Sequence, residues 1–515
     1  MSRDLVLAHD LGTTGNKATL VRVDGCLVGS AFHGYDTFYP AIGWAEQDPE
    51  DWWAAFQLTT ARLMRESGAD PARVAAVSFS GQMMGCLPVD RAGTPLRRSI
   101  IWADQRGLKE AALLAERVGE ERVYAITGHR ISPTYSLEKL LWVRTHEPDV
   151  FKRTHRVLHA KDFLRLRLTG TVETDYSDAS GMNLFDLGRK DWSDEILSAV
   201  GLGREILPEV GPSTKVVGEI DRKSAEGLGL RAGTPVVMGG GDGPCAAVGA
   251  GVVAEGSAYN YIGSSSWIAL AARTPVLDPD RRTFTFWHLD PDMVMPTGTM
   301  QSAGASYQWM RNQLCGLEVA EAERQGVSAY ELMNRQAASV PAGCRGLLFL
   351  PYLMGERSPH WNPAARGVFL GLTLTHGRAD MIRAVLEGVS FNLRIILDAF
   401  LRQGVRVPTI RVIGGGAKGA LWCQILADIM NRPIERLALL EEATALGAAI
   451  AGGVGAGVFR DFGVARSIVK VAETYHPQPA VRDVYERQYE AFQEAYRALV
   501  PIYARLQALT GKETP

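Results

Sequence analysis

The residues best suited to chemistry near the N-terminus lie in the segment 10–17, whose sequence is DLGTTGNK. Two short apolar runs flank it, and the second alternates in polarity, so we expect two strands joined by a hairpin turn. A glycine turn that carries Thr13 and Thr14 presents backbone N–H groups and hydroxyls that suit phosphate oxygens. The carboxylate of Asp10 suits a hydrated Mg²⁺, which binds through few acidic groups. An ordinary glycine turn without a ligand explains the same residues equally well.

A second acid, Asp242, follows the apolar run 235–238 and three glycines, and it precedes a helix-like stretch. Glycines beside an acid at a strand end let the backbone approach a ligand closely. A carboxylate in that place can accept the proton of an attacking hydroxyl group, as an aspartate does in protein kinases. The same residue could instead be a helix N-cap, which needs no ligand. Asp242 is therefore a candidate general base.

A glycine-rich segment, 414–419, lies between a predicted strand at 409–413 and a predicted helix at 420–430. It matches the dinucleotide-binding pattern G-x-G-x-x-G, and Glu435 follows at about the expected distance. Glu435 opens the next apolar stretch rather than closing it, which argues against a nicotinamide-dependent dehydrogenase. We interpret the glycines as a wall for a nucleotide base and ribose. A tight strand-to-helix connection is the alternative.

Two polar segments follow predicted strands in the first third of the chain. One contains Gln82, and the other carries Trp102, Asp104 and Arg106. An indole can cover the apolar face of a sugar, whereas amide, carboxylate and guanidinium groups bind hydroxyls. Because the last three residues are spaced by two, an extended segment would carry them on one face. Core packing is the alternative for Trp102.

The elements that must position these residues alternate between strands and helices, which predicts α/β layers. Further strands are expected at 75–79 and 347–350, and helices at 51–65 and 379–402. The segment 259–270 repeats the strand, turn and strand of the N-terminus, with Ser264 and Ser265 in its turn. This echo predicts two similar domains that share a cleft.

We place the boundary between the domains within 252–257. The predicted domains are 1–254, for the sugar and the catalytic base, and 255–480, for the nucleotide. Residues 481–515 are expected to form a C-terminal helix that packs on the core, because 485–509 is amphipathic.

The composition is that of an ordinary globular protein. A formal charge of −2 over 515 residues, without charge runs, gives no basis for binding nucleic acid or a membrane surface. The six cysteines contain no C-x-x-C pair, which predicts neither a zinc knuckle nor a disulfide framework. We expect a cytoplasmic protein without a signal peptide or membrane span. P-loop, H-E-x-x-H and G-x-S-x-G motifs are absent from the sequence, which argues against those enzyme classes.

Taken together, the motifs resemble those of the FGGY carbohydrate kinases, part of the sugar kinase, Hsp70 and actin superfamily. The resemblance covers nearly the whole chain. It rests on D-x-G-T-T with Lys17, S-G-Q-M with W-x-D-Q-R, K-D-F-L-R at 161–165, G-G-G-D at 239–242, G-E-R-S-P at 355–359, and the glycines 414–416 ahead of 442–447. Within the family, the segments 80–83 and 351–357 are most similar to the xylulose kinases.

The resemblance implies two actin-like α/β domains of ribonuclease H-like fold that flank a catalytic cleft, with ATP and Mg²⁺ as cofactors. It implies that Asp242 is the general base and that Asp10 lies near the metal. The residues expected to face the phosphates are Thr13, Thr14, Lys17, Ser264 and Ser265. Those expected to line the nucleotide site are Gly304, Gly415, Gly416 and Gly419. Those expected to line the sugar pocket are Gln82, Met83, Met84, Trp102, Asp104 and Arg106, together with Asp242.

Two positions depart from the xylulose kinase pattern. That pattern usually has histidine in place of Met84 and an amide side chain in place of Gly243. Neither residue can supply the hydrogen bonds that those side chains make. The expected activity is phosphorylation of a ketose or polyol, with D-xylulose as the first candidate substrate. Ribulose, erythritol, gluconate or a non-catalytic, actin- or Hsp70-like sugar sensor are the alternatives, and the oligomeric state, including a homodimer, is left open.

Overall fold

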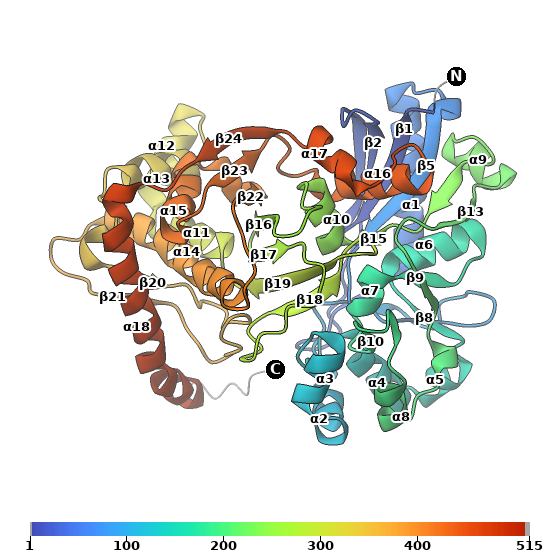
Figure 1. Cartoon of the computed structure of the whole chain (residues 1–515), viewed down its shortest axis with the longest axis horizontal. Helices are drawn as coiled ribbons and strands as arrows, with labels where there is room; N and C mark the ends of the chain where they lie inside the picture. Colours follow the sequence, from blue (N-terminus) through green and yellow to red (C-terminus); the bar gives the residue numbers. More distant parts are fainter. Residues whose placement is uncertain (1–2, 510–515) are drawn as a thin grey trace.

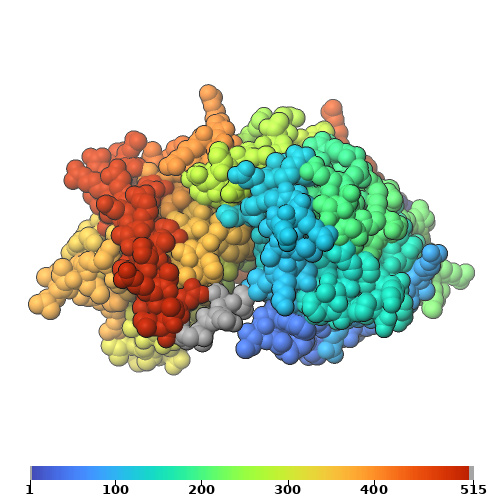
Figure 2. Space-filling model, turned by 90° about the horizontal axis from the view of Figure 1, so that it is seen from below, coloured from blue at the N-terminus to red at the C-terminus, as the bar shows by residue number. Residues whose placement is uncertain are grey.

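The structure is a computed structural model that describes residues 3–509. These residues form two lobes, each built around a seven-stranded sheet (Figure 1). The sheet of the N-terminal lobe runs β13 (Val216–Glu219), β14 (Pro235–Val237), β5 (Val74–Gly81), β1 (Leu5–Leu11), β2 (Gly15–Arg22) and β3 (Leu27–Gly34), with β15 (Gly240–Gly241) paired to β5. The sheet of the C-terminal lobe runs β18 (Phe284–Trp287), β19 (Val294–Met300), β17 (Ser266–Leu270), β16 (Ala258–Ile262), β22 (Ile410–Ile413), β23 (Ile434–Leu437) and β24 (Val471–Tyr475). Figure 2 shows the two lobes side by side.

Both sheets repeat one plan, an antiparallel hairpin with a parallel strand beside its first strand. β1 pairs antiparallel with β2 and parallel with β5. β16 pairs antiparallel with β17 and parallel with β22. The strand, turn and strand echo that the sequence predicts is therefore confirmed, and so is the α/β class.

The helices that matter below lie around these sheets. They are α1 (Pro49–Ser67), α6 (Ala160–Thr169), α7 (Tyr176–Ser180), α10 (Asp242–Gly249), α11 (Gly304–Leu314), α13 (Ala329–Ala338), α14 (Arg378–Arg402), α15 (Ala420–Met430), α16 (Ala443–Gly455) and α18 (Arg482–Leu509). Local sequence sets the ends of α1. The Asp48 side chain accepts a hydrogen bond from the Glu50 amide, Pro49 occupies the first turn, and Gly68 ends the helix in the left-handed conformation.

Helices α10 and α16 cross at a distance that only glycine allows. A Cβ atom added to Gly249 would lie 1.7 Å from the Ala443 carbonyl oxygen, and one added to Gly447 would lie 1.8 Å from the Cys245 carbonyl oxygen. Helix α16 follows the C-terminal sheet strand β23 in the chain, yet it packs against β1 and β5 of the N-terminal lobe (Figure 1). The predicted domain boundary at 254–255 stays a prediction. It assigns α16 to the second domain, although this helix packs on the sheet of the N-terminal lobe.

The C-terminal helix α18 packs on the C-terminal lobe (Figure 1). The Tyr485 hydroxyl donates to Glu387 of α14 at 2.8 Å, and the Phe391 ring lies 5.6 Å from that of Phe492. Residues 510–515 of the predicted C-terminal segment lie outside the described residues. Among residues 3–509, no helix has the length and apolar character that a membrane span requires.

Candidate active site

The register of three neighbouring strands places the two candidate acids at one edge of the N-terminal sheet. Asp10 of β1 lies opposite Ser80 of β5, and Gly240 of β15 lies opposite the same serine from the other side. Asp242 directly follows β15. Since β1, β5 and β15 are parallel, their carboxyl ends meet at the same edge, where α/β sheets bind ligands. Asp10 and Asp242 therefore belong to one site.

Asp242 is the first residue of α10, and Gly241 is the N-cap. The N-cap role that the sequence left open for Asp242 is therefore not the one it has. Its Oδ1 atom accepts a hydrogen bond of 2.7 Å from the Gly243 amide, and its side chain is exposed. The positive end of the helix dipole favours a negative charge at this position.

The surroundings of Asp242 nevertheless disfavour its charged form. Although the side chain reaches solvent, the many protein atoms near it weaken the hydration of the carboxylate and raise the pKa of Asp242 to about 7. The negative charge of Asp10 acts in the same direction. Burial also raises the pKa of Asp10, and the nearby charge of Lys17 opposes that shift. A carboxyl group with a pKa near 7 is well matched to proton transfer at neutral pH.

The N-terminal hairpin turn is held by neighbours from several elements. The Thr13 hydroxyl accepts a hydrogen bond of 2.9 Å from the Trp102 indole. The Thr13 backbone carbonyl accepts one of 2.6 Å from the Gln47 side-chain amide. Thr14 is exposed. Lys17 lies opposite Asp10 in the hairpin, and its ammonium group lies 3.5 Å from Glu442, the residue before α16. The sequence reasoning did not assign a role to Glu442.

A cavity of about 910 Å³ opens beside the second hairpin, in the C-terminal lobe. This volume is in the range of small-molecule sites. Five of the predicted residues line it: Ser264, Gly304, Gly415, Gly416 and Gly419. Ser265 is not among the lining residues. A Cβ atom on Gly304 would lie 2.3 Å from the Gly263 carbonyl oxygen, so α11 can begin against the hairpin turn only with glycine.

Aromatic and amide side chains that the sequence reasoning missed line the same cavity. Tyr307 of α11, Tyr330 and Asn334 of α13, and Trp422 of α15 belong to this set. The Tyr307 hydroxyl donates to Asn334 at 2.8 Å, and the Tyr307 and Tyr330 rings lie 5.2 Å apart. Aromatic faces and an amide suit a nucleobase. The one available signal was the spacing of Tyr330 and Asn334, which places both on one face of a helix.

The dinucleotide-binding interpretation of the glycines 414–419 requires that Glu435 be free to bind a ribose. Glu435 is the second residue of β23, and its carboxylate lies 3.2 Å from the Arg411 guanidinium of the neighbouring strand β22. A ribose-binding acid would have to project freely toward the ligand. The glycine segment instead lines the cavity of the C-terminal lobe, which agrees with its interpretation as a wall.

The first three residues predicted for the sugar pocket follow directly after β5. Gln82 is buried and donates to Gln47 at 2.7 Å, and Met83 is buried against Gly241, where an added Cβ would lie 2.5 Å from its sulfur. Met84 is half-buried with a φ of 60°, and its carbonyl accepts a hydrogen bond of 2.7 Å from Lys139. These three residues lie next to the strand that leads to Asp242.

The prediction that Trp102, Asp104 and Arg106 share one face is wrong. Residues 102–107 form turns rather than a strand, so the period of two does not apply. Trp102 is exposed, whereas Asp104 is fully buried and accepts hydrogen bonds from the Ala45 amide and the Arg106 guanidinium. Arg106 also contacts Glu46 at 2.8 Å. The other oxygen of Asp104, Oδ1, accepts a hydrogen bond of 2.9 Å from the Arg106 amide, so both oxygens of Asp104 are used within the protein and the Asp104–Arg106 pair holds the loop that carries Trp102.

Comparisons with known proteins agree with this geometry. Residues 5–249 match the model of the FGGY family of carbohydrate kinases, N-terminal domain, and residues 258–456 match that of its C-terminal domain. The chain is 34% identical to the xylulose kinase of Staphylococcus epidermidis, over 99% of this chain and 100% of that one. It is 31% identical to the gluconokinase of Bacillus subtilis, over 98% and 96% of the two chains. The crystal structure of ligand-bound xylulose kinase from Lactobacillus acidophilus matches with a TM-score of 0.90 at 27% identity, over 98% and 99%.

Proposed function

The chain belongs to the FGGY family of carbohydrate kinases, and we propose that it transfers the γ-phosphoryl group of ATP to D-xylulose, giving D-xylulose 5-phosphate. The observation that carries the proposal is the register that brings Asp10 and Asp242 to one sheet edge. The cavity of the C-terminal lobe supports an ATP site. A cytoplasmic enzyme agrees with the free cysteines.

The proposed reaction is an in-line phosphoryl transfer. Asp242 accepts the proton of the sugar hydroxyl as its oxygen attacks the γ-phosphorus, and ADP leaves with the electrons of the broken P–O bond. Lys17 and the backbone amides of the two hairpin turns face the phosphates and stabilise their charge. Trp102 and Met84 border the sugar, and closure of the lobes excludes water as a competing acceptor.

The acids at the sheet edge also fit a metal ion. Asp10 offers carboxylate oxygens, which Mg²⁺ prefers, and burial disfavours its charged form. We propose that Asp10 holds the ion. When bound, Mg²⁺ neutralises phosphate charge.

The test of the function is sugar-dependent release of ADP across a panel of pentuloses, hexuloses, polyols and aldonates. We expect D-xylulose to give the highest kcat/KM. A clear preference for gluconate or another panel member would assign the chain to a different FGGY activity. Binding of sugar and ATP with no ADP release from any member would instead indicate a sensor.

The two departures near Asp242 supply a prediction about substrate preference. A Cβ atom on Gly243 would meet only the Met295 methyl group, at 3.6 Å, so an asparagine side chain has room there. We expect Met84→His with Gly243→Asn to raise kcat/KM for D-xylulose by about 30-fold, since two restored hydrogen bonds of about 1 kcal/mol each lower the barrier by about 2 kcal/mol. The single variant Gly243→Ala, which adds volume without a hydrogen bond, is the control. A double variant with unchanged preference across the panel would show that these positions do not select the sugar.

The pKa of Asp242 predicts the pH dependence of the reaction. Its pKa is raised to about 7, so the carboxylate that accepts the proton is lost as the pH falls through 7. We expect kcat/KM to fall about tenfold per pH unit below that value and to level off above it. Activity should be measured at constant ionic strength with thermal stability followed at each pH. A profile that stays flat down to pH 5 would exclude Asp242 as the titrating base.

A further inference from the structure

A buried cluster of charged side chains lies beneath the strand that leads to Asp242. Its members are His159, Lys161, Asp162 and Arg165 at the start of α6, with Asp175 and Asp178 at α7. The Lys161 ammonium contacts Asp162, Asp175 and Asp178 at 2.7, 2.8 and 2.7 Å. The ammonium group donates a hydrogen bond to Asp162 and forms ion pairs with Asp175 and Asp178.

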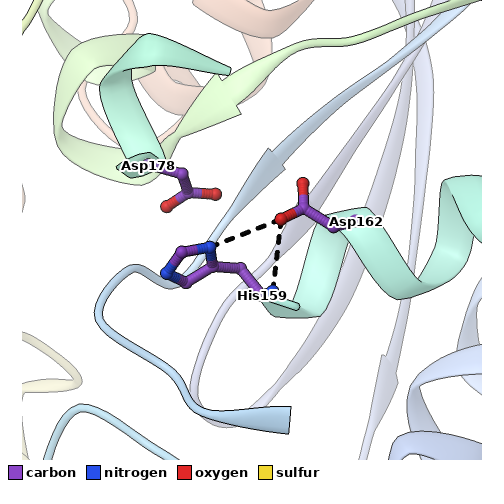
Figure 3. A group of neighbouring side chains, drawn as sticks. All are labelled: His159, Asp162 and Asp178. Carbon is purple, nitrogen blue, oxygen red and sulfur yellow. Dashed lines mark hydrogen bonds and ion pairs between the residues drawn. The ribbon is translucent and has the colours of Figure 1, made fainter. Parts of the chain in front are cut away.

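Three members of the cluster have the spacing of a metal site but not its electrostatics. Ligand atoms of His159, Asp162 and Asp178 lie within 4.8 Å of one another. Figure 3 shows the His159 ring beside both carboxylates, with one hydrogen bond between the ring and Asp162 and a second from the His159 backbone amide to Asp162. Lys161 contacts both carboxylates, and Arg165 contacts Asp162. Since the Lys161 and Arg165 cations already contact these acids, the cluster is an ion-pair network and not a cation site.

One branch of this network reaches the residue before Asp242. Asp175 accepts hydrogen bonds from the Ser177 hydroxyl and from the Ser177 amide, the latter at 2.9 Å. The Ser177 hydroxyl in turn accepts a hydrogen bond of 2.9 Å from the Gly241 amide. All of these side chains are buried. Because the hydroxyl proton points at Asp175, the lone pairs of Ser177 are directed at Gly241.

The glycines before Asp242 allow the network to touch the backbone itself. A Cβ atom on Gly240 would lie 2.9 Å from the Ser177 hydroxyl oxygen and 2.2 Å from a Leu289 methyl group. A Cβ atom on Gly241 would collide with Met83 from the other side. The strand β15 is thus held between β5, the Ser177 hydroxyl and Met83 just before the chain turns into α10.

We propose that Lys161, Asp175 and Ser177 form a clamp that positions Asp242 by fixing the Gly241 amide. The inference rests on the proposed function, in which Asp242 is the general base. Lys161 orients the Asp175 carboxylate, Asp175 orients the Ser177 hydroxyl, and Ser177 holds the last peptide before Asp242. Ser177 is a positioning residue, since it acts through Gly241.

The test compares two buried serines that both donate to Asp175. Ser177 also accepts from Gly241, whereas the Ser213 side chain donates to the same Asp175 oxygen at 2.9 Å and has no bond to Gly241. We expect Ser177→Ala to lower kcat by about 10- to 100-fold, the usual cost of a small misplacement of a catalytic group. KM for both substrates should stay within about twofold. Ser213→Ala should lose thermal stability to a similar degree but keep its kcat.

The conservative variants keep the test decisive. Ser177→Thr retains the hydroxyl and should keep most of the wild-type kcat. Ser177→Cys nearly keeps the side-chain volume but offers a weaker hydrogen-bond acceptor, so its kcat should fall. This second variant tests the clamp even if Ser177→Ala does not fold. Equal losses of kcat in Ser177→Ala and Ser213→Ala, or full activity in Ser177→Cys, would overturn the clamp. Wild-type ADP release on the sugar panel is measured first, so a failed function is recognised before any clamp variant is interpreted.

Discussion

Asp242→Asn is expected to lower kcat by about 10²- to 10⁴-fold, the usual contribution of a general base. The amide has nearly the same shape and can keep the hydrogen bond from the Gly243 amide, but it cannot accept the proton of the sugar hydroxyl. ATP binding should stay close to that of the wild type, because the cavity of the C-terminal lobe contains no atom of this residue. The measurements are ADP release at saturating substrates and ATP affinity by titration.

Stability should respond to this substitution in the opposite direction. The pKa of the Asp242 carboxyl group is about 7 in the folded chain and near 4 in the unfolded chain. As the pH rises above about 4, the unfolded chain loses this proton more readily, so the carboxyl group destabilises the fold. The neutral amide removes that cost, so Asp242→Asn should melt no lower than the wild type at pH 8. The exposed Asp149→Asn is the control for loss of a negative charge. Turnover within threefold of the wild type in Asp242→Asn would remove Asp242 from the mechanism.

Gly447→Ala is expected to destabilise the protein by about 3 kcal/mol, at the upper end of the usual cost of overpacking. Its methyl group would lie 1.8 Å from the Cys245 carbonyl oxygen, so two helix backbones must separate. Helix α10 begins at Asp242, and α16 begins directly after Glu442, the partner of Lys17. Separation of the helices should therefore also reduce kcat. The measurement is the thermal midpoint together with ADP release.

The matched control is Gly227→Ala in the helix Arg222–Leu228. Apart from the adjacent residues and the backbone of its own helix, no atom lies within 4 Å of a Cβ atom added there, so this change should be neutral or stabilising by up to about 1 kcal/mol. If Gly447→Ala melted with the wild type, the close crossing of α10 and α16 would not be a determinant of stability.

Local sequence was sufficient for the elements that carry the catalytic and nucleotide residues. The hairpin around Thr13 and the one around Ser264 follow from alternating polarity and glycine turns, and the glycines 414–419 follow from the strand and helix beside them. These signals are local, because a turn or a helix end is determined by residues a few positions apart. The prediction for Asp104 and Arg106 failed because a turn replaced the strand on which it depended.

The sequence by itself determined the α/β class, the repeated hairpin plan, the two acids and most of the cavity glycines. Only the tertiary structure decided that Asp10 and Asp242 flank one strand, that Tyr307, Tyr330 and Trp422 meet in one cavity, and that Ser177 holds Gly241. The physical reason is that burial, ion pairing and the close crossing of two helices depend on groups far apart in the chain. Periodicity and turn chemistry carry no information about which distant groups will meet.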